Sequence, residues 1–334
     1  MAQKFFIKIT DKNEWQDLLG KVLFKTFFHF WEWEEFLESQ FKWLKFERYL
    51  WREQAILSLA RVKIFGKEKL ISHPFCEYGG PLPLAAKIDG KEFSENLLRE
   101  FEGTPLKISF HPYLLNYFEN LEFPENERET LFLEDIDKKS VNDIWLALDR
   151  NRHRSINSAL SQNLAVEECQ TAKELKDLYS FYVKSLKKHR AIPYPFSFFK
   201  FFLDNPQAKI LLVKDENKTV GGNVFLNYQK IAHSFLCGFE EKYRKLGAHS
   251  LVLWEEIKSA RAEGFQTFDF GATRKNSSIG DFKERWGAKP YPISELKNYS
   301  GEPRLRKSKL RNIFGLLPPF LIEKLGPCLL KYKL

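Results

Sequence analysis

The order of elements that the second half of this 334-residue chain predicts is its most restrictive feature. LAVEEC (164–169) alternates like a strand, and Thr171 with Glu174 forms a capping box that opens a helix running toward His189. Prolines bound a second helix within 193–206. This segment therefore predicts a strand followed by two helices.

Strands dominate the pattern beyond residue 206. AKILLVK and KTVGGNVFLNY flank the turn residues 215–217 and predict a hairpin, with a third strand at 230–239. A helix from Leu246 to Glu263 follows, which Gly264 closes. The last expected elements are a buried strand (266–271), a short helix (282–288) and a strand (289–299).

The first half repeats this order more faintly. EWQDLL and WEWEEFLESQF predict two helices, KWLKFERYL and QAILSLARVKIF two strands, KLISHPFCEYGGP a strand and loop, KEFSENLLREFEG a helix, and PLKISFHP a strand. The chain length also favours two domains of about 150 residues each. We interpret the pattern as an internal duplication; one domain with added segments is the alternative.

The expected domain boundaries follow from this duplication. The first domain covers 1–140 and the second 141–300, joined by a charged, helix-prone stretch (135–162) in which Ser140 is an N-cap. A cleft between two such domains is a usual place for ligands. Residues 301–334 form a tail.

The net charge of +9, from 53 basic and 44 acidic residues, favours phosphate-bearing partners such as a nucleotide, tRNA, an anionic lipid or a coenzyme pyrophosphate. A merely lysine-rich composition gives the same balance. The four cysteines form no CxxC pair, which argues against a zinc site or a disulfide framework. No ligand cluster is visible either, so we expect no metal site. No signal peptide is visible at the N-terminus, so we expect a cytoplasmic protein.

The tail combines a basic run, RLRKSKLR (304–311), with broken apolar patches in 313–334. No run reaches the roughly 18 apolar residues that span a bilayer. The pattern suits peripheral contact with the anionic inner face of a membrane. Packing across the seam between the domains is an equal alternative.

Three motifs resemble one family. They are FDFGATRKNSSIGDFKERWGA (268–288), HPFCEYGGPL (73–82) and the Arg154-Ser-Ile-Asn-Ser-Ala segment. Together they resemble the Fem-type transferases, which add amino acids to peptidoglycan precursors, and their shorter acetyltransferase-like relatives. The resemblance covers roughly residues 26–299. It implies an α/β fold with mixed sheets, made of two tandem GNAT-like acyltransferase domains.

Lys283 is the first catalytic candidate. Acyl transfer to an amine needs a group that stabilises the oxyanion as it forms, and a fixed lysine can serve. The resemblance implies that the lysine of the Phe-Lys pair is functionally important, with Phe282 and Trp286 beside it at the substrate. Without the resemblance, a lysine flanked by aromatic residues is expected to have a solvated ammonium and a buried aliphatic stem.

Asp269 is the second catalytic candidate. It lies in an apolar strand, where a carboxylate must be paired or perturbed. It can act as a base or a positioning group for the amine. A structural role, as a partner for Arg274 or in a backbone turn, is the favoured alternative. Arg274 itself is also a substrate-binding candidate.

The remaining substrate-binding candidates come from the other two motifs. Arg154 in the basic run 150–154 can grip a phosphate of the acceptor, or it can belong to an exposed charged helix. The glycines of Tyr78-Gly79-Gly80 permit close approach of a ligand to the backbone, or they form a tight turn. The resemblance implies that this loop lies near the substrate.

The donor question concerns Arg244-Lys-Leu-Gly247-Ala248-His249. GNAT enzymes bind the pyrophosphate of acyl-coenzyme A at a helix N-terminus preceded by Arg/Gln-x-x-Gly-x-Gly/Ala. Arg244, Gly247 and Ala248 are thus donor-binding candidates, but histidine replaces the last small residue. This departure weakens acyl-coenzyme A (acyl-CoA) and leaves aminoacyl-tRNA or an acyl carrier as donors. No tightly bound cofactor is expected.

Three functions remain open. His189 and His233 have no triad-like company and no nucleophile motif is visible, so we expect direct transfer without a covalent enzyme intermediate. The first hypothesis is transfer of an aminoacyl group from charged tRNA to an amine of a cell-wall or surface-glycan precursor. The second is acylation of a polysaccharide or amino sugar from acyl-CoA or an acyl carrier, and the third is a non-catalytic module that binds a lipid-linked glycan. DNA is not an expected partner.

Overall fold

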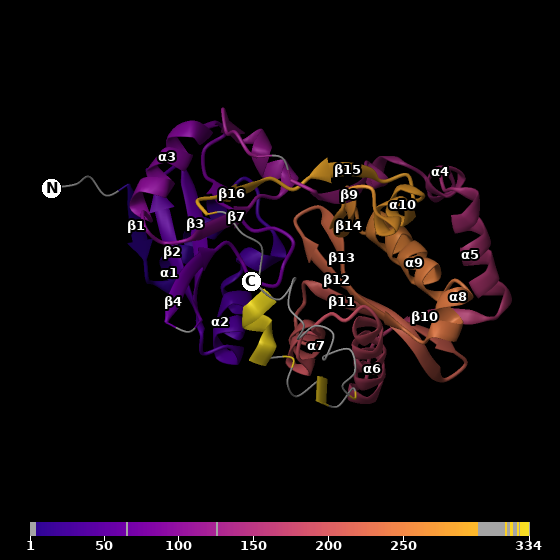
Figure 1. Ribbon diagram of the computed structural model, residues 1–334. Coiled ribbons are helices and arrows are strands. Elements are labelled where there is room, and N and C mark those ends of the chain that lie inside the picture. The colour runs from indigo at the N-terminus through magenta and orange to yellow at the C-terminus, as the bar shows by residue number, and fades with distance from the viewer. Residues whose placement is uncertain are drawn as a thin grey trace. The chain divides into compact units, whose positions relative to one another are not determined.

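The computed structural model divides the chain into two compact units (Figure 1). Unit 1 comprises Met1–Glu129 and Tyr291–Gly301, and unit 2 comprises Thr130–Pro290 and Glu302–Leu334. Each unit has a mixed sheet of seven strands among the residues that the structure describes. Those residues are 5–64, 66–124, 126–299, 318, 321, 322, 326 and 328–333.

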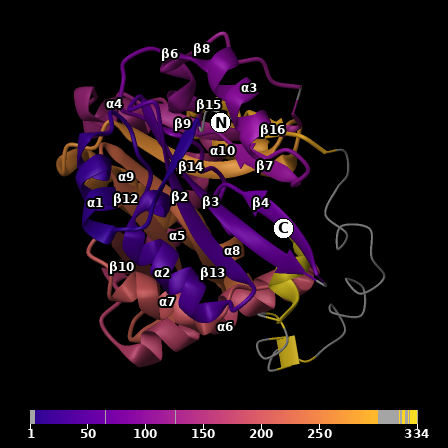
Figure 2. The ribbon, with the colours of Figure 1, turned by 90° about the vertical axis from the view of Figure 1, so that its left-hand side faces the viewer.

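Unit 1 contains the sheet β1-β2-β3-β4-β7-β16, with β5 paired to β3. Figure 2 shows β2, β3 and β4 side by side in this order. The elements are β1 (Phe6–Ile9), α1 (Lys12–Lys21), η1 (Phe27–His29), α2 (Trp31–Gln40), β2 (Leu44–Trp51), β3 (Ala55–Ile64), β4 (Lys67–Ile71), β5 (Leu82–Pro83), β6 (Ile88–Asp89), α3 (Gly90–Glu100), β7 (Leu106–Ser109), η2 (Pro112–Asn116), β8 (Phe118–Glu119) and β16 (Glu295–Lys297).

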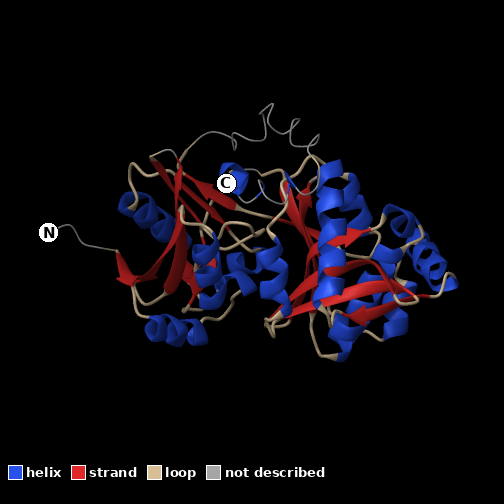
Figure 3. Cartoon of the chain, turned by 90° about the horizontal axis from the view of Figure 1, so that it is seen from below, coloured by secondary structure: helices blue, strands red, loops and turns tan. Residues whose placement is uncertain are grey.

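Unit 2 contains the sheet β10-β11-β12-β13-β14-β9-β15. Figure 3 shows helices on both of its faces. The elements are β9 (Arg128–Glu134), η3 (Ile136–Lys138), α4 (Val141–Leu146), α5 (Arg150–Ser161), β10 (Leu164–Glu168), α6 (Ala172–Lys188), α7 (Phe196–Leu203), β11 (Ala208–Asp215), β12 (Lys218–Tyr228), β13 (Ile231–Phe239), α8 (Glu241–Lys245), α9 (Ala248–Ala262), β14 (Thr267–Arg274), α10 (Ser278–Glu284) and β15 (Lys289–Pro292).

The two units share one topology. In each, four strands pair antiparallel in chain order and a crossover helix leads to a parallel strand: β1 to β4, α3 and β7 in unit 1, and β10 to β13, α9 and β14 in unit 2. Two helices stand between the first and second strands of both sheets. The expectation of two tandem GNAT-like domains is confirmed.

Local signals explain the helices that the sequence predicts. The Thr171 side chain accepts from the Glu174 N–H and the Glu174 carboxylate accepts from the Thr171 N–H, which fixes the start of α6. Ser140 and Asp143 form the same box at α4. Pro195 is the N-cap of α7, as the prolines predict.

The chain exchanges strands at the expected domain borders. β9 lies before residue 140 but forms part of the second sheet, and residues 291–301 return to unit 1, where β16 pairs with β7. The division after Glu129 therefore differs from the expected boundary after residue 140. The single strand expected over 289–299 is wrong, because two short strands there join different sheets.

The C-terminal tail lies largely outside the described residues, including the basic run 304–311. Within the described part of the chain, no helix has the length and apolar character needed to cross a membrane.

Candidate functional site

The parallel strands β13 and β14 separate partway along the sheet of unit 2. They pair at Ile231↔Thr267, Ala232↔Phe268 and His233↔Asp269. Beyond these pairs β13 continues to Phe239 against β12, while β14 runs on to Arg274. Backbone groups that leave a ladder in this way become available to a ligand or a side chain.

Lys283 places its ammonium at this separation. Its Nζ donates to the carbonyl oxygens of Gly271 (2.6 Å) and Ala272 (3.2 Å), both on β14 past the last pair with β13. The side chain is buried, with 8% of the residue exposed. Burial raises the pKa of the Cys237 thiol on β13, and the charges of Arg244 and Lys283 oppose that shift. The ammonium is therefore bound to one of the diverging strands and acts electrostatically on the other.

Asp269 lies at the last pair before the strands separate. Its Oδ1 accepts from Thr130 Oγ1 (2.8 Å) and from the Gly271 N–H (2.7 Å). His233 Nε2 lies 3.9 Å from its Oδ2, and Asp269, His233 and Thr130 are all fully buried. The sequence suggested Arg274 as a partner, but Arg274 is exposed. The turn bond to Gly271 is present, and the sequence missed Thr130 and His233.

A pocket of about 750 Å³ lies beside the end of β13, where this strand has separated from β14. Among its cations, Lys188 pairs with Glu241 (3.1 Å) and Lys218 with Glu240 (2.7 Å). Lys184 and Arg244 pair with no carboxylate in the described part of the chain. The lining residues are Asp177, Ser180, Phe181, Lys184, Ser185, Lys188, His189, Lys218, Cys237, Gly238, Phe239, Glu240, Glu241, Arg244 and His249.

Helix α5 packs against the N-terminus of α9, where a GNAT domain would hold a pyrophosphate. Gly247 has φ +96° and is the N-cap, and a Cβ there would lie 1.9 Å from the Ser155 carbonyl oxygen. Arg152 of α5 donates to Ser250 Oγ (3.0 Å) in the first turn of α9. The predicted donor residues Gly247 and Ala248 are thus buried, while Arg244 lines the pocket.

His249 and Phe282 stack parallel, with ring centroids 5.4 Å apart. Burial lowers the pKa of His249 to about 3, helped by the charges of Arg244, Arg152 and Lys283. A neutral imidazole therefore stands where the GNAT loop pattern has a small residue.

The basic run of α5 contributes a different arginine from the one that the motif suggests. Arg154 is exposed. Arg152 is buried, and its guanidinium lies 4.4 Å from the centroid of the Phe282 ring. Trp286 is fully buried against Phe270 (5.8 Å), so it contributes to the core beneath α10.

The Tyr78-Gly79-Gly80 loop closes the equivalent separation in unit 1. β4 and β7 pair at Leu70↔Leu106 and Ile71↔Lys107. The Gly79 N–H then donates to the Ser109 carbonyl (2.9 Å), and Gly79 bridges Phe110. Tyr78 is fully buried, and Gly80 has φ +95°. The loop thus lies in unit 1 at the separation where unit 2 places Lys283.

A buried polar network supports this loop. His29 Nε2 lies 3.2 Å from the Gly80 carbonyl oxygen, and the His29 and His73 rings meet at 4.5 Å. His73 Nε2 lies 3.1 Å from Glu34 Oε1, and Arg48 Nε donates to Glu34 Oε2 (2.5 Å). Burial lowers the pKa of each histidine to about 3 and raises that of Glu34 to about 7. No local sequence pattern predicts this network, because its members lie on separate elements of unit 1.

The described residues include no group of three His, Cys, Asp or Glu side chains that could hold a metal ion.

Comparisons with known proteins show which domain and which folds the chain resembles. Residues 149–286 match the family model described as acetyltransferase (GNAT) domain. The fold resembles that of FemX, with a TM-score of 0.64 and 14% identity over 88% of this chain and 97% of that one. It also resembles L-PGS from Bacillus licheniformis (TM-score 0.55, 11% identity, 94% and 97%) and a tandem GNAT protein of clavulanic acid biosynthesis (0.50, 8%, 89% and 99%). No curated protein sequence matches.

The match to an acetyltransferase (GNAT) domain covers residues 149–286, which belong to unit 2. The fold of the whole chain, with its two similar units, is the one seen in FemX and in the tandem GNAT protein.

Proposed function

We propose that unit 2 transfers an aminoacyl group from charged tRNA to an amine of a cell-wall or surface-glycan precursor. The observation that supports this most is Lys283, whose ammonium is fixed where β13 and β14 separate. The pocket beside it holds Lys184 and Arg244, which pair with no carboxylate among the described residues.

The reaction on this proposal is a direct acyl transfer. The acceptor amine attacks the ester carbonyl of the donor, a C–N bond forms, and the C–O bond to the ribose oxygen breaks. The amine proton ends on the leaving hydroxyl. Lys283 stabilises the negative charge that develops on the carbonyl oxygen, because a fixed cation in a water-poor site acts more strongly than one in water. Asp269, held by Thr130 and Gly271, is the candidate base or positioning group.

The α9 N-terminus argues against acyl-CoA as the donor. The backbone of α5 packs on Gly247, and the imidazole of His249 occupies the position of a small residue. A pyrophosphate needs free N–H groups and space at that helix end. An RNA-linked donor does not depend on this cradle and can use the cations of the neighbouring pocket.

The proposal places the reaction in the cytoplasm, with the tail 301–334 at the inner face of the membrane. A lipid acceptor is the second candidate, because a domain of a putative lysylphosphatidylglycerol synthetase is among the solved structures with a similar fold. An amino-sugar acceptor with an acyl-CoA donor remains the third.

The test is mass-spectrometric transfer by the purified full chain. The reaction contains a lysine-bearing muramyl-pentapeptide precursor and mixed charged tRNAs, with or without ribonuclease. We expect the precursor to gain the mass of one aminoacyl group, and ribonuclease to abolish that gain. Gain from acyl-CoA with an amino-sugar acceptor, without gain from tRNA, would reject the proposal.

A further inference from the structure

Three neighbouring strands of the unit 1 sheet, β4, β7 and the edge strand β16, align lysines on one face. β16 pairs antiparallel with β7 at Lys297↔Lys107 and Glu295↔Ser109, and β4 pairs parallel with β7 at Ile71↔Lys107. Side chains alternate along a strand, so Lys69 shares the face of Ile71 and Lys107. Three adjacent strands thus present Lys69, Lys107 and Lys297 together.

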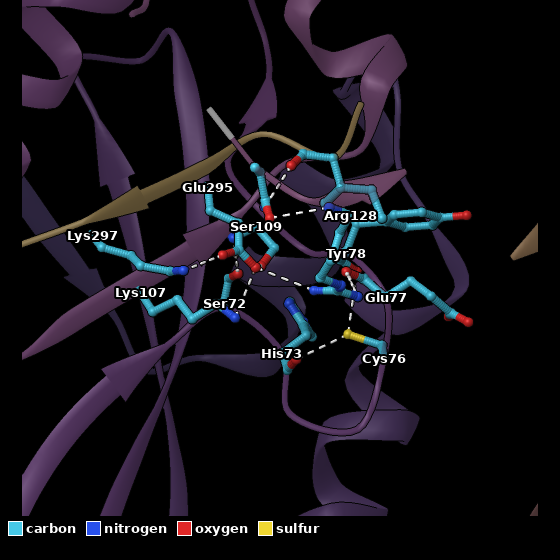
Figure 4. Close-up of polar contacts among 12 residues, drawn as sticks. Ser72, His73, Cys76, Glu77, Tyr78, Lys107, Ser109, Arg128, Glu295 and Lys297 are labelled. Carbon is cyan, nitrogen blue, oxygen red and sulfur yellow. Dashed lines mark hydrogen bonds and ion pairs between the residues drawn. The ribbon is translucent and has the colours of Figure 1, made fainter. Parts of the chain in front are cut away.

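One buried carboxylate balances most of this charge. Glu295 pairs with Lys107 (2.8 Å), Arg128 (3.2 Å) and Lys297 (Figure 4). It also accepts from Ser109 Oγ (3.2 Å). Three cations therefore share a single carboxylate that is 3% exposed.

Lys69 adds a fourth cation without another carboxylate. It forms no ion pair with any residue that the structure describes, and its Nζ lies 4.9 Å from the centroid of the Tyr299 ring. Burial lowers the pKa of Lys69 to about 8, and the charges of Lys107 and Lys297 act in the same direction, against the charge of Glu295. The Lys69 ammonium is therefore held beside like charges.

One neighbouring carboxylate is engaged by other cations. Glu68, next to Lys69 in β4, pairs with Arg61 (2.9 Å). Arg128 reaches Glu77 through its carbonyl oxygen (3.4 Å). The cluster therefore has more cations than the single carboxylate of Glu295 can balance. Its cations are Lys69, Lys107, Arg128 and Lys297.

We propose that the Lys69, Lys107, Arg128 and Lys297 cluster binds a phosphate or diphosphate ester. Amines and a guanidinium around one place match the several oxygens and charges of such a group, which would relieve the repulsion among the cations. The strand exchange that brings β16 into unit 1 supplies both Glu295 and Lys297. That the ester belongs to the acceptor rests on the proposed function; the anion site itself does not.

The experiment measures the affinity of the full chain for inorganic pyrophosphate by calorimetry. Lys69→Met should weaken binding about tenfold, as for loss of one charge-assisted hydrogen bond, and Lys69→Arg should restore most of it. Glu295→Gln should tighten binding. The matched control is Lys45→Met, which makes the same charge change at an exposed position of β2. Thermal unfolding of each variant verifies that it is folded.

The pH dependence gives a second readout. Because the pKa of Lys69 is about 8, binding by the wild type should weaken as the pH rises from 7 to 9, and Lys69→Met should show a smaller change. The other groups that face Lys69 are Lys107, Lys297, Glu295 and Tyr299, and all of them remain in the variant.

Two probes distinguish the source of the phosphate. Pyrophosphate reports a soluble ester, and phosphatidylglycerol vesicles report a lipid headgroup. Binding of either probe that depends on Lys69 supports the site, even if the chain transfers nothing in the aminoacyl assay. No binding of either, or equal loss in Lys45→Met and Lys69→Met, overturns it.

Discussion

Lys283→Met should lower kcat for acyl transfer about 10²–10³-fold, which is the usual effect of removing one oxyanion stabiliser. The ammonium is fixed by two β14 carbonyls where β13 and β14 separate, so no other described side chain takes its position. The loss should fall on kcat with little change in the KM of either substrate, because the interaction strengthens as charge develops on the carbonyl oxygen.

Two further variants make this result specific. Lys283→Arg should retain part of the rate, since it keeps the charge with a different geometry. Lys289→Met removes a lysine from the exposed edge strand β15 and should leave kcat unchanged. A kcat for Lys283→Met within threefold of the wild type, in a variant with native thermal unfolding, would remove Lys283 from the mechanism.

Arg48→Met should lower the free energy of unfolding by about 3–5 kcal/mol, as expected when one partner of a buried ion pair is removed. Glu34 is fully buried, and the variant leaves its carboxylate without the guanidinium that binds it. The added substitution Glu34→Gln should recover part of the loss. Denaturant unfolding measures the three free energies.

The same variant has a predicted pH dependence. The raised pKa of Glu34 means that the folded state holds a proton that the unfolded state releases between about pH 4.5 and 7. Without Arg48 that pKa rises further, so the cost of Arg48→Met should be larger at pH 8 than at pH 5. Arg52→Met, which breaks the exposed pair with Glu92, should cost about 1 kcal/mol or less at either pH. Equal costs for the two arginine variants would contradict the role of the network.

Local patterns were sufficient to predict most elements of both units. The α6 capping box, the prolines around α7 and the hairpin of β11 and β12 each depend on residues close together in the sequence. The strand exchange was not predictable in this way. β9 and β16 join sheets whose other strands are far away in the chain, and periodicity within a segment does not specify its partner.

In the candidate site, too, some residues were predictable from local patterns and others were not. Lys283 came from a motif, and its catalytic role stays a prediction. The bond from Thr130 to Asp269 joins residues 139 positions apart, which no local pattern reports. Arg152 could have been found, because it stands four and seven positions before the buried residues Ile156 and Ala159 and so lies on the inner face of α5. The expected residue Arg154 lies on the outer face.

The two units have diverged at the same topological position. In unit 1 the loop at Gly79 closes the separation of the parallel strands, and in unit 2 Lys283 lies there instead. This contrast is why the proposed transfer is placed in unit 2.

The central claim is that unit 2 takes an RNA-linked donor and not acyl-CoA, and equilibrium binding tests it most directly. The full chain is titrated with acetyl-CoA and with an RNA minihelix that carries a stable amide-linked amino acid. We predict that the minihelix binds, that Lys184→Glu weakens it about tenfold at low salt, and that acetyl-CoA neither binds nor competes. Stoichiometric binding of acetyl-CoA, with no affinity for the minihelix, would contradict the claim.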